Sequence, residues 1–412
     1  MYDFLTESTR LLRQAGELGG IDPAVIDLLA EPMRIVAFRI PLRLDDGRRR
    51  IFQAYRVRHN DALGPSRDGT RISADLDLDE VKALGLIMSI KHAAGEIPAG
   101  GGKGGIVAEP RDLSRWEYER LCRAYIRHLQ PSGPDYDVPG ADIGTDLQSM
   151  AWMLDEYEQV AGGHRPAAID DKPIILGGSP GGYEATGGGV FDTTQEAIGP
   201  LGLSIDGAAI AIQGFGQVGS VAARLYAEAG ARVLAVSDRE GGVHRDDGLD
   251  IEALAVHAAE AGTVAGFPGG EAIGNAELLV CACDVLVPAA VQGVLTVENA
   301  DRVQARLIVE GANSPTSVDA DAVLTDRGIT VVPDIIANSG SVHVCQMERS
   351  QGLYDNRWSF EQVEELRRER MLRAYREALH AGGRHGVRSA RLGAWINALE
   401  RLQLAIKTRG WL

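Results

Sequence analysis

A single lysine, Lys103, stands among five glycines in the stretch IPAGGGKGGI, residues 97–106. Glycine loses more backbone freedom on ordering than any other residue, so the stretch predicts a loop. Bare glycines would let backbone and ammonium crowd a small ligand. An enclosed lysine can have a lowered pKa and can polarise a carbonyl or an imine. A solvated loop lysine is the alternative. A P-loop is excluded, because Ile97 stands where glycine is needed and Gly104 follows the lysine in place of Ser or Thr.

A second lysine, Lys91, falls on the helix predicted from DLDLDEVKALGLIMSIKHAAGE. Val81, Leu84, Ile87 and Met88 share one face of that helix, and Lys91 points between Leu84 and Ile87. A lysine inside an apolar stripe either extends its ammonium to solvent or meets an anion. Two lysines bracketing one segment favour a carboxylate ligand.

A glycine turn in AIAIQGFGQVGSVAARL predicts a dinucleotide site. Gly214, Gly216 and Gly219 have GxGxxG spacing between an apolar strand and an amphipathic helix. Gly214 would form the tight turn, and Gly216 would let backbone amides approach a pyrophosphate at the helix N-terminus. Gly219 would let helix and strand pack closely. A purely structural turn is the alternative. The same turn adds three cofactor-binding candidates, Phe215, Gln217 and Val218.

Cofactor choice depends on the end of the next apolar strand, ARVLAVSD, which closes on Asp238. A carboxylate at this place accepts the adenosine ribose hydroxyls and repels a 2′-phosphate, so Asp238 favours NAD. Arg239 follows directly and could bind that phosphate, so NADP stays possible.

The elements that position these residues change in character along the chain. The alternating residues 35–57, interrupted by a DDG turn, predict two strands. Helices are expected near 113–130 and 146–160, the second with Thr145 and Gln148 in capping-box spacing. Beyond residue 189, short apolar strands alternate with helices, which indicates a parallel sheet covered on both faces.

These patterns predict an α/β protein whose second domain is a doubly wound, Rossmann-type dinucleotide-binding domain. Long charged helices follow from about residue 358 and are expected to pack back on the first domain. The expected divisions are a substrate and oligomerisation domain at 1–188, the dinucleotide-binding domain at 189–340, and C-terminal helices at 341–412.

Composition excludes several function classes. The net charge of −16 and the pI of about 5.1 argue against nucleic acid or anionic lipid as the main partner. Four scattered cysteines suggest no disulfide framework and fit a reducing cytoplasm, with Cys281 and Cys283 as small buried residues. We expect no signal peptide and no membrane span. No His/Cys cluster has metal-ligand spacing, so we predict no metal.

Seven motifs in a fixed order carry a family resemblance: RVRHNDALGPSRDGTR, LGLIMSIKHAAGEIPAGGGKGGI, DVPGADIGTD, GGSPGGYEATGGGV, IQGFGQVGS, EGANSPT and PDIIANSGSV. From about residue 30 to about residue 350 the chain resembles the Glu/Leu/Phe/Val dehydrogenase superfamily, and its lead-in YRVRHNDALGP resembles the hexameric glutamate dehydrogenases. The resemblance implies reversible oxidative deamination of an L-amino acid, with NAD(P)⁺ and water, to a 2-oxo acid and ammonia. It also implies a homo-oligomer, usually a hexamer.

The resemblance implies roles for individual residues. Lys103 would polarise the substrate carbonyl or activate the attacking water, and Lys91 would grip the α-carboxylate. Asp142, in PGADIGT, would shuttle protons to and from the amino group; by itself it would be taken for an exposed turn aspartate. Met88 would line the substrate site. Positions near the nicotinamide, its ribose and its carboxamide would be Thr186, Asn313 and Asn338. Turn and cap chemistry is their alternative role. A cleft between the domains would close over the substrate.

The departures from the family pattern bear on the substrate side chain. Where glutamate dehydrogenases show GPYKGG, with a lysine that pairs with the side-chain carboxylate, this chain reads GPSRDG. Arg67 could still fork onto a carboxylate, but Asp68 beside it could neutralise its charge. Cys345 stands where the family has a serine that touches that carboxylate. Other departures are Gly182 and Gly188 for arginine, and Ser339 and Ser341 for Ala and Gly.

Three interpretations therefore stand. The chain is a glutamate dehydrogenase with Arg67 as side-chain anchor, a dehydrogenase for another amino acid with a pocket reshaped by Arg67, Asp68 and Cys345, or a nucleotide-binding relative without turnover. The context of YRVRHNDALGP and GGGKGG favours glutamate. The persistence of Lys91, Lys103 and Asp142 argues against the third interpretation.

Overall fold

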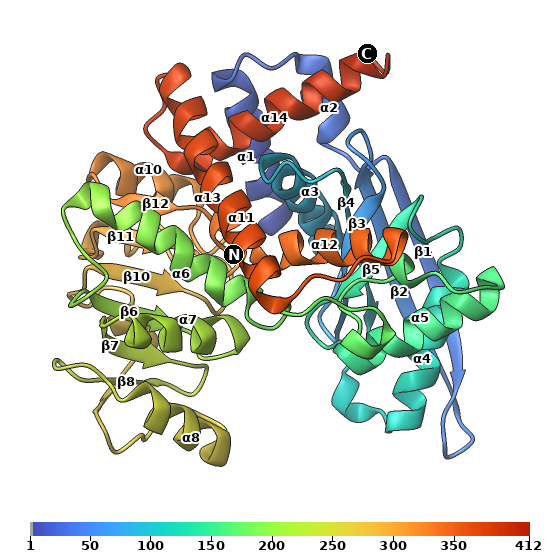
Figure 1. Ribbon diagram of the computed structural model, residues 1–412, viewed down its shortest axis with the longest axis horizontal. Coiled ribbons are helices and arrows are strands. Elements are labelled where there is room, and N and C mark those ends of the chain that lie inside the picture. Colours follow the sequence, from blue (N-terminus) through green and yellow to red (C-terminus); the bar gives the residue numbers. More distant parts are fainter. Residues whose placement is uncertain (1–2) are drawn as a thin grey trace. The chain divides into compact units, whose positions relative to one another are not determined.

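The computed structural model describes residues 3–412, and these divide into two compact units (Figure 1). The first unit contains the chain up to Gly182 together with Val342–Val363 and Asn397–Leu412. The second contains Tyr183–Ser341 and Glu364–Ile396. The first boundary thus lies six residues before the expected one at 188, and the C-terminal helices are shared between the units.

The expectation that residues 341–412 all return to the first domain needs correction for Glu364–Ile396. Helix α13 (Phe360–Arg384) carries Arg367, which forms a buried ion pair with Asp192 at 2.9 Å. Helix α14 (Ala390–Thr408) carries Arg391 in its first turn, and the guanidinium of Arg391 lies 2.5 Å from Glu310. These buried charge pairs hold the segment in the second unit, and the charged helix pattern contains no sign of them.

The first unit is built on a five-stranded sheet in the order β1-β2-β4-β3-β5. β1 and β2 form the long antiparallel hairpin predicted for residues 35–57, drawn in blue in Figure 1. β2 pairs antiparallel with β4, whereas β3 runs parallel to both β4 and β5. The strands are β1 (Arg34–Arg43), β2 (Arg49–Asn60), β3 (Ser66–Ser73), β4 (Gly100–Val107) and β5 (Asp137–Ala141).

The glycine-rich stretch is the central strand β4, so the predicted loop is wrong. A Cβ at Gly101 would overlap atoms of Ser89 and Gly85 on the helix that covers the sheet. On Gly104 it would overlap the Tyr125 hydroxyl. Neighbouring elements therefore approach the strand too closely for any side chain, and this packing overrides the poor strand propensity of glycine.

Helix α3 (Leu78–Ala94) covers one face of this sheet, and α4 (Arg115–His128) and α5 (Leu147–Ala161) pack against the opposite face. Every residue of α3 from Ala83 to Ala94 is buried, so the helix has no single apolar stripe; the four residues predicted to share a face are all buried. The unit also contains α1 (Phe4–Leu18), α2 (Pro23–Leu29) and most of α12 (Gly340–Tyr354). Its short 3-10 helices are Pro110–Asp112, Pro166–Ala168 and Ile174–Leu176.

The second unit has a seven-stranded sheet in the order β12-β11-β10-β6-β7-β8-β9. β12, β11, β10, β6 and β7 are parallel, and β8 and β9 continue the sheet in antiparallel pairings. The predicted doubly wound parallel sheet is confirmed. The strands are β6 (Ala209–Gln213), β7 (Arg232–Ser237), β8 (Gly242–His244), β9 (Glu271–Ile273), β10 (Val285–Pro288), β11 (Leu307–Val309) and β12 (Thr330–Val332).

Helices lie on both faces of the second sheet, as the continuously apolar strands require. Ala211 and Leu286 join a core with Leu324 on one face, whereas Ile212 lies against α7 on the other. The main helices are α6 (Ala185–Ile198), α7 (Gln217–Glu228), α8 (Ile251–Ala261), α9 (Asn275–Leu278), α10 (Val318–Asp326) and α11 (Asp334–Ala337), with 3-10 turns at Gly199–Leu201 and Ala300–Arg302.

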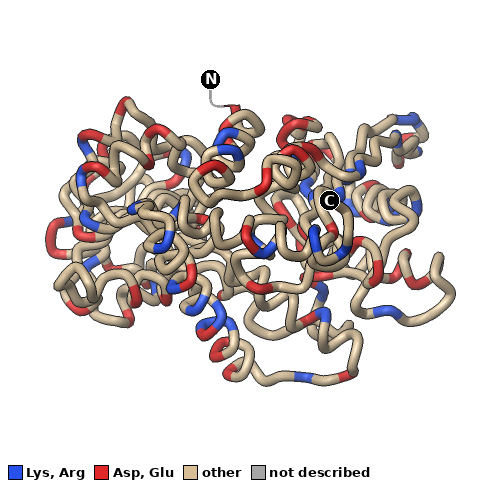
Figure 2. Tube along the Cα trace, turned by 90° about the horizontal axis from the view of Figure 1, so that it is seen from above, with Lys and Arg blue, Asp and Glu red and all other residues tan. Residues whose placement is uncertain are grey.

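Acidic and basic residues are interspersed along both units (Figure 2). Within residues 3–412, no helix is long and apolar enough to cross a bilayer. Over the same residues, no group of three or more His, Cys, Asp or Glu side chains could hold a metal ion.

Candidate active site

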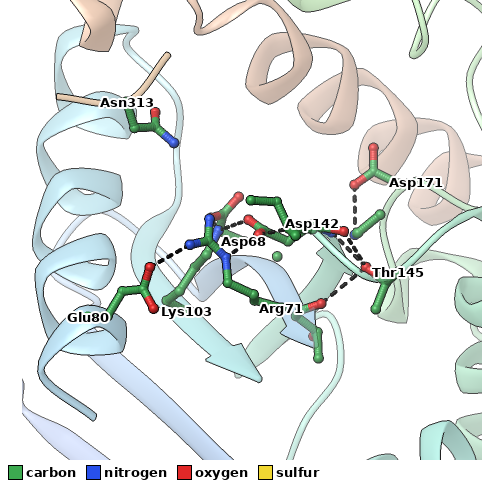
Figure 3. A network of polar contacts seen from close by, with 12 residues as sticks. Asp68, Arg71, Glu80, Lys103, Asp142, Thr145, Asp171 and Asn313 are labelled. Atoms are coloured by element: carbon green, nitrogen blue, oxygen red, sulfur yellow. Dashed lines mark hydrogen bonds and ion pairs between the residues drawn. The ribbon is translucent and has the colours of Figure 1, made fainter. Parts of the chain in front are cut away.

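The ammonium of Lys103 meets two carboxylates in the first unit (Figure 3). Its Nζ donates to Oδ2 of Asp68 at 2.7 Å and to Oδ2 of Asp142. The three residues come from β3, β4 and the loop that follows β5, three neighbouring strands of the sheet. Only 3% of Lys103 is exposed, so the predicted solvated-loop alternative does not describe it.

Asp142 is held in place by the turn that follows β5. Its backbone N–H donates to Oγ1 of Thr145 at 2.7 Å, and its Oδ1 accepts from the backbone of Ile143 at 2.7 Å. Oδ1 also accepts from Nε of Arg71 at 2.7 Å, and Arg71 in turn binds Glu80 at 2.6 Å. The predicted capping role of Thr145 needs correction, because Asp146 caps α5 and Thr145 instead orients Asp142.

The charges in this cluster stabilise one another. Burial acts to lower the pKa of Lys103, but the carboxylates of Asp142 and Asp68 outweigh it and raise the pKa above its ordinary value. Burial likewise acts to raise the pKa of Asp142, and Lys103 and Arg71 reverse this, holding the pKa below its usual range. Burial alone would lower the lysine pKa, but the paired carboxylates prevent this, and the lysine and Asp142 keep each other ionised at neutral pH.

Asp68 has a backbone conformation that favours glycine, with φ of +135°. A non-glycine residue in this region stores strain, of order 1–3 kcal/mol, and such residues cluster at functional sites. The strain explains why a glycine suits this position in the family motif. In this chain the residue is an aspartate, and its carboxylate is a second hydrogen-bond partner for Lys103 besides Asp142.

Lys91 lies in the last turn of α3 and is only 5% exposed, and Met88 is buried one turn earlier. The pKa of the adjacent His92 depends on the charges around it. Burial, followed by the cationic charges of Arg67 and Lys91, lowers the pKa of His92 to about 3. Arg67 and Lys91 thus both act on the same buried imidazole, whose Nδ1 donates to the carbonyl of Gly100 at 2.9 Å.

Arg67 is neutralised, but not by the residue that the sequence suggests. Its Nε lies 2.5 Å from Oδ2 of Asp170, and its Nη1 donates to Oε1 of Gln346 at 2.8 Å. Asp68, the predicted neutraliser, binds Lys103 instead. Both side chains of the Arg67–Asp170 pair are 3% exposed, so solvent screens the attraction little.

Cys345 lies beside this pair. Its Sγ donates to Oδ1 of Asp171 at 3.2 Å, and burial and the negative charge of Asp171 raise the thiol pKa well above its usual value. Burial and the charge of Asp170 raise the pKa of Asp171 to about 6. Behind them, the buried Lys172 ammonium pairs with Glu348. The cysteine is therefore a neutral thiol.

The glycine turn of the second unit has the geometry of an anion-binding helix start. Gly214 adopts φ of +101°, and a Cβ on Gly219 would overlap the carbonyl of Gly214. Nothing lies within 4 Å of the Cβ position of Gly216, and no side chain caps the first amides of α7. Phe215 and Val218 are half-buried, and Gln217 is exposed and donates to the carbonyl of Tyr183 at 2.9 Å.

Asp238 lies at the end of β7, as predicted. Its Oδ2 accepts from Oγ1 of Thr263 at 2.8 Å and from the backbone of Val264 at 2.7 Å. Burial acts to raise its pKa, but these hydrogen bonds lower it overall, so the carboxylate is charged. Arg239 is an exposed side chain that lies 3.0 Å from Glu240, which offsets its charge.

The remaining cofactor candidates gather in the second unit. Nδ2 of Asn338 donates to Oδ1 of Asn313 at 3.0 Å. A Cβ on Gly340 would overlap the carbonyl of Ala185, which places the Asn338 turn against the start of α6, next to Thr186. The family's arginine at Gly188 is missing, but the guanidinium of Arg367 lies against that glycine from α13.

Three site residues were not found by sequence reasoning: Arg71, Thr145 and Asp170. Arg71 stands four residues after Arg67 on the same strand, and strand periodicity does not distinguish it from a solvated residue. Asp170 lies 103 residues from its partner Arg67. The acidic pair Asp170–Asp171 ahead of an apolar stretch was the available signal.

Two family patterns match the chain. The pattern described as Glu/Leu/Phe/Val dehydrogenase, dimerisation domain, matches residues 32–159, and the Glutamate/Leucine/Phenylalanine/Valine dehydrogenase pattern matches residues 177–410. Among curated proteins, the NAD-specific glutamate dehydrogenase of Staphylococcus aureus is 40% identical, over 99% of both chains. The cryptic catabolic NAD-specific glutamate dehydrogenase of Bacillus subtilis is also 40% identical, over 100% of this chain and 96% of that protein.

Solved structures agree with these matches. A leucine-bound hetero-hexameric glutamate dehydrogenase of Thermus thermophilus is 36% identical and superposes with a TM-score of 0.94, over 100% of this chain and 98% of that one. The glutamate dehydrogenase of Peptoniphilus asaccharolyticus is 35% identical with a TM-score of 0.87, over 99% and 100% of the two chains.

Proposed function

The chain belongs to the Glu/Leu/Phe/Val dehydrogenase family and is an NAD(P)-dependent amino-acid dehydrogenase, and we propose that it deaminates an L-amino acid reversibly with NAD. Glutamate is the reference substrate, because relatives named NAD-specific glutamate dehydrogenases match nearly the whole chain. The observation that carries the proposal is the buried Lys103–Asp142 pair, which supplies a proton donor and a proton acceptor in contact.

The proposed roles follow from charge and burial. The ammonium of Lys91, which is buried in the last turn of α3, binds the substrate α-carboxylate, the role that the family resemblance of its motif implies. Lys103 polarises the carbonyl or imine and orients the attacking water, and Asp142 accepts the proton of the substrate ammonium. Arg67 and Cys345, both buried, would contact the substrate side chain, and the buried Met88 would line the apolar part.

Proton transfer requires the resting cluster to rearrange. Two cations, Lys103 and Arg71, hold the pKa of Asp142 low, so its carboxylate is a weak base in the structure described. A substrate ammonium that displaces Lys103 from Asp142 would hydrogen-bond the carboxylate directly, and loss of the Lys103 ion pair would offset the added substrate charge, so the proton to be transferred already lies on the carboxylate's partner. Lys103 would then be free to donate toward the substrate oxygen, which gives each residue its separate role.

The second unit fits a dinucleotide. The open space at Gly216 and the uncapped amides at the start of α7 suit a pyrophosphate, and the Asp238 carboxylate suits ribose hydroxyls. Thr186, Asn313 and Asn338 would hold the nicotinamide ribose and carboxamide. Bound NAD supplies the hydride acceptor for the substrate Cα. The fixed charge of Asp238 favours NAD over NADP.

A panel of 2-oxo acids with ammonia and either NADH or NADPH tests the proposal through the absorbance of the reduced nicotinamide. Turnover with 2-oxoglutarate alone would identify a glutamate dehydrogenase. Turnover with uncharged oxo acids would identify a dehydrogenase for another amino acid, which the neutralised Arg67 favours. Nucleotide binding without oxidation across the whole panel would instead identify a relative without turnover.

We infer a homo-oligomer in the cytoplasm. β1 is an edge strand whose alternate residues are exposed, so a second copy could extend the sheet there. The four cysteines are free thiols, as in a reducing compartment. Light scattering on the purified chain tests whether it forms an oligomer. The chain is measured without other proteins, because the Thermus relative is hetero-hexameric and a homo-oligomer must form from this chain alone. A monomeric mass would contradict the inference.

A further inference from the structure

Arg67 and Asp170 form a buried ion pair in which one donor atom and one acceptor atom are unsatisfied within the described residues. Both residues are 2% exposed, and their one direct bond joins Nε to Oδ2 at 2.5 Å. Within residues 3–412, neither Nη2 of Arg67 nor Oδ1 of Asp170 has a hydrogen-bond partner. Buried polar atoms rarely stay unsatisfied, so a donor and an acceptor here indicate a place for a ligand group that can accept and donate.

Within the described residues, the charges around the pair are mostly matched, except that of Arg349, which acts on both Arg67 and Asp170 while its Nη2 donates to the carbonyl of Pro134 at 2.9 Å. Lys172 is matched by Glu348, and Gln346, which binds Arg67, is neutral. Cys345 is a neutral thiol that bonds to Asp171. An added carboxylate would approach Arg67 but would also face the Asp170 carboxylate, and like charges at close range in a buried site are strongly unfavourable.

We propose that Asp170 sets the side-chain selectivity of the site, by pairing with Arg67 so that the subsite favours an uncharged, hydrogen-bonding side chain over a carboxylate. The inference rests on the proposed amino-acid dehydrogenase function and names the class of side chain that it takes. A carboxamide matches both atoms, because its oxygen accepts from Nη2 of Arg67 and its NH₂ donates to Oδ1 of Asp170. A carboxylate can satisfy only the first.

Glutamate and glutamine test this directly, because their side chains have nearly the same shape and differ in charge. The kcat/KM ratio of glutamine to glutamate is measured with NAD for the wild type, Asp170→Asn and Asp171→Asn. Asp170→Asn removes the charge and leaves Arg67 available, so the ratio should move toward glutamate by on the order of tenfold or more. Asp171→Asn removes the neighbouring carboxylate that accepts from Cys345, and its ratio shows how much of any change is a general effect of charge near the site. Asp155→Asn, at an exposed carboxylate that pairs with Arg123, is the control and should leave the ratio unchanged.

A second readout keeps the inference separate from the proposed function. Calorimetric titration of each amino acid into the protein saturated with NADH, which cannot accept a hydride, measures the same selectivity as a ratio of dissociation constants without turnover. Asp170→Ser serves as a second variant, and thermal melting selects the variants that are folded. A ratio that is the same in the wild type and in folded Asp170 variants would overturn the inference. Absence of turnover with every amino acid, together with an Asp170-dependent binding ratio, would overturn only the proposed function.

Discussion

The Nζ of Lys103 lies 2.7 Å from Oδ2 of Asp68, a residue whose φ of +135° is rarely adopted by non-glycine residues. The strained strand residue thus gives the lysine a second counter-ion besides Asp142. Two carboxylates around one buried ammonium keep it protonated, so Lys103 acts first as a proton donor and an electrostatic group. Its task as a base must wait for substrate to alter the pairing.

Lys103→Ala should reduce kcat by on the order of 10³-fold, because it removes the group that stabilises charge developing in the transition state. Reductive amination of the best oxo acid under saturating cofactor measures the effect. Asp142 would be left without its nearest cation, so thermal melting should accompany the kinetics. A kcat close to that of the wild type would contradict the role assigned to Lys103.

Lys91→Ala should raise KM for the amino acid strongly, since the buried ammonium would no longer meet the α-carboxylate. Lys82→Ala is the matched control, because Lys82 lies on the same helix and pairs with the exposed Glu31, at 3.3 Å. Initial rates over a range of amino-acid concentrations separate KM from kcat. Equal KM values for the two variants would remove Lys91 from the carboxylate site.

The sequence predicted the second unit well because its signals are local. An apolar strand, a glycine turn and a helix follow one another within a few residues, and the position of Asp238 depends only on the end of the next strand. The first unit behaved differently. The glycine run was expected to be a loop, and it became the central strand β4 because Gly101 and Gly104 must admit neighbouring elements.

Pairings between distant residues could not be predicted from the sequence. Asp68 stands beside Arg67 in the chain, yet Asp170 neutralises the arginine. The assignment of the C-terminal helices failed for a related reason. Arg391 forms ion pairs with three buried carboxylates of the second unit, those of Glu310, Asp321 and Asp334. No spacing rule connects residues so far apart.

Gly216→Ala and Gly219→Ala should separate cofactor binding from folding. A Cβ on Gly216 meets open space within the protein, so the melting temperature should be unchanged while the dissociation constant for NAD rises. A Cβ on Gly219 overlaps the carbonyl of Gly214, so this variant should unfold at a lower temperature. Calorimetry with NAD and thermal melting provide the two readouts. Unchanged NAD affinity in Gly216→Ala would place the pyrophosphate elsewhere.

Asp238→Ser should shift the cofactor preference toward NADP by about tenfold or more, because it removes the carboxylate that repels a 2′-phosphate. The ratio of kcat/KM values for NADPH and NADH measures the shift. Glu252→Gln is the control, since Glu252 is an exposed carboxylate of the same unit, in the first turn of α8. If both variants change the ratio equally, general surface charge and not Asp238 determines the preference.

Asp171 should make the protein less stable as the pH rises. Burial and the neighbouring Asp170 raise the pKa of Asp171 to about 6, above its ordinary value of 3.8, so the folded state holds the proton more tightly than the unfolded state. Its stabilising contribution is therefore present at low pH and is lost as the pH rises through about 6, with a slope that approaches about 1.4 kcal/mol per pH unit.

Urea unfolding of the wild type and Asp171→Asn across this range measures the difference, with the exposed Asp135→Asn as control. Because Asn cannot titrate, the variant should lose less unfolding free energy between about pH 4 and about pH 7. Parallel curves for the wild type and Asp171→Asn would mean that Asp171 titrates normally and that the repulsion from Asp170 is absent.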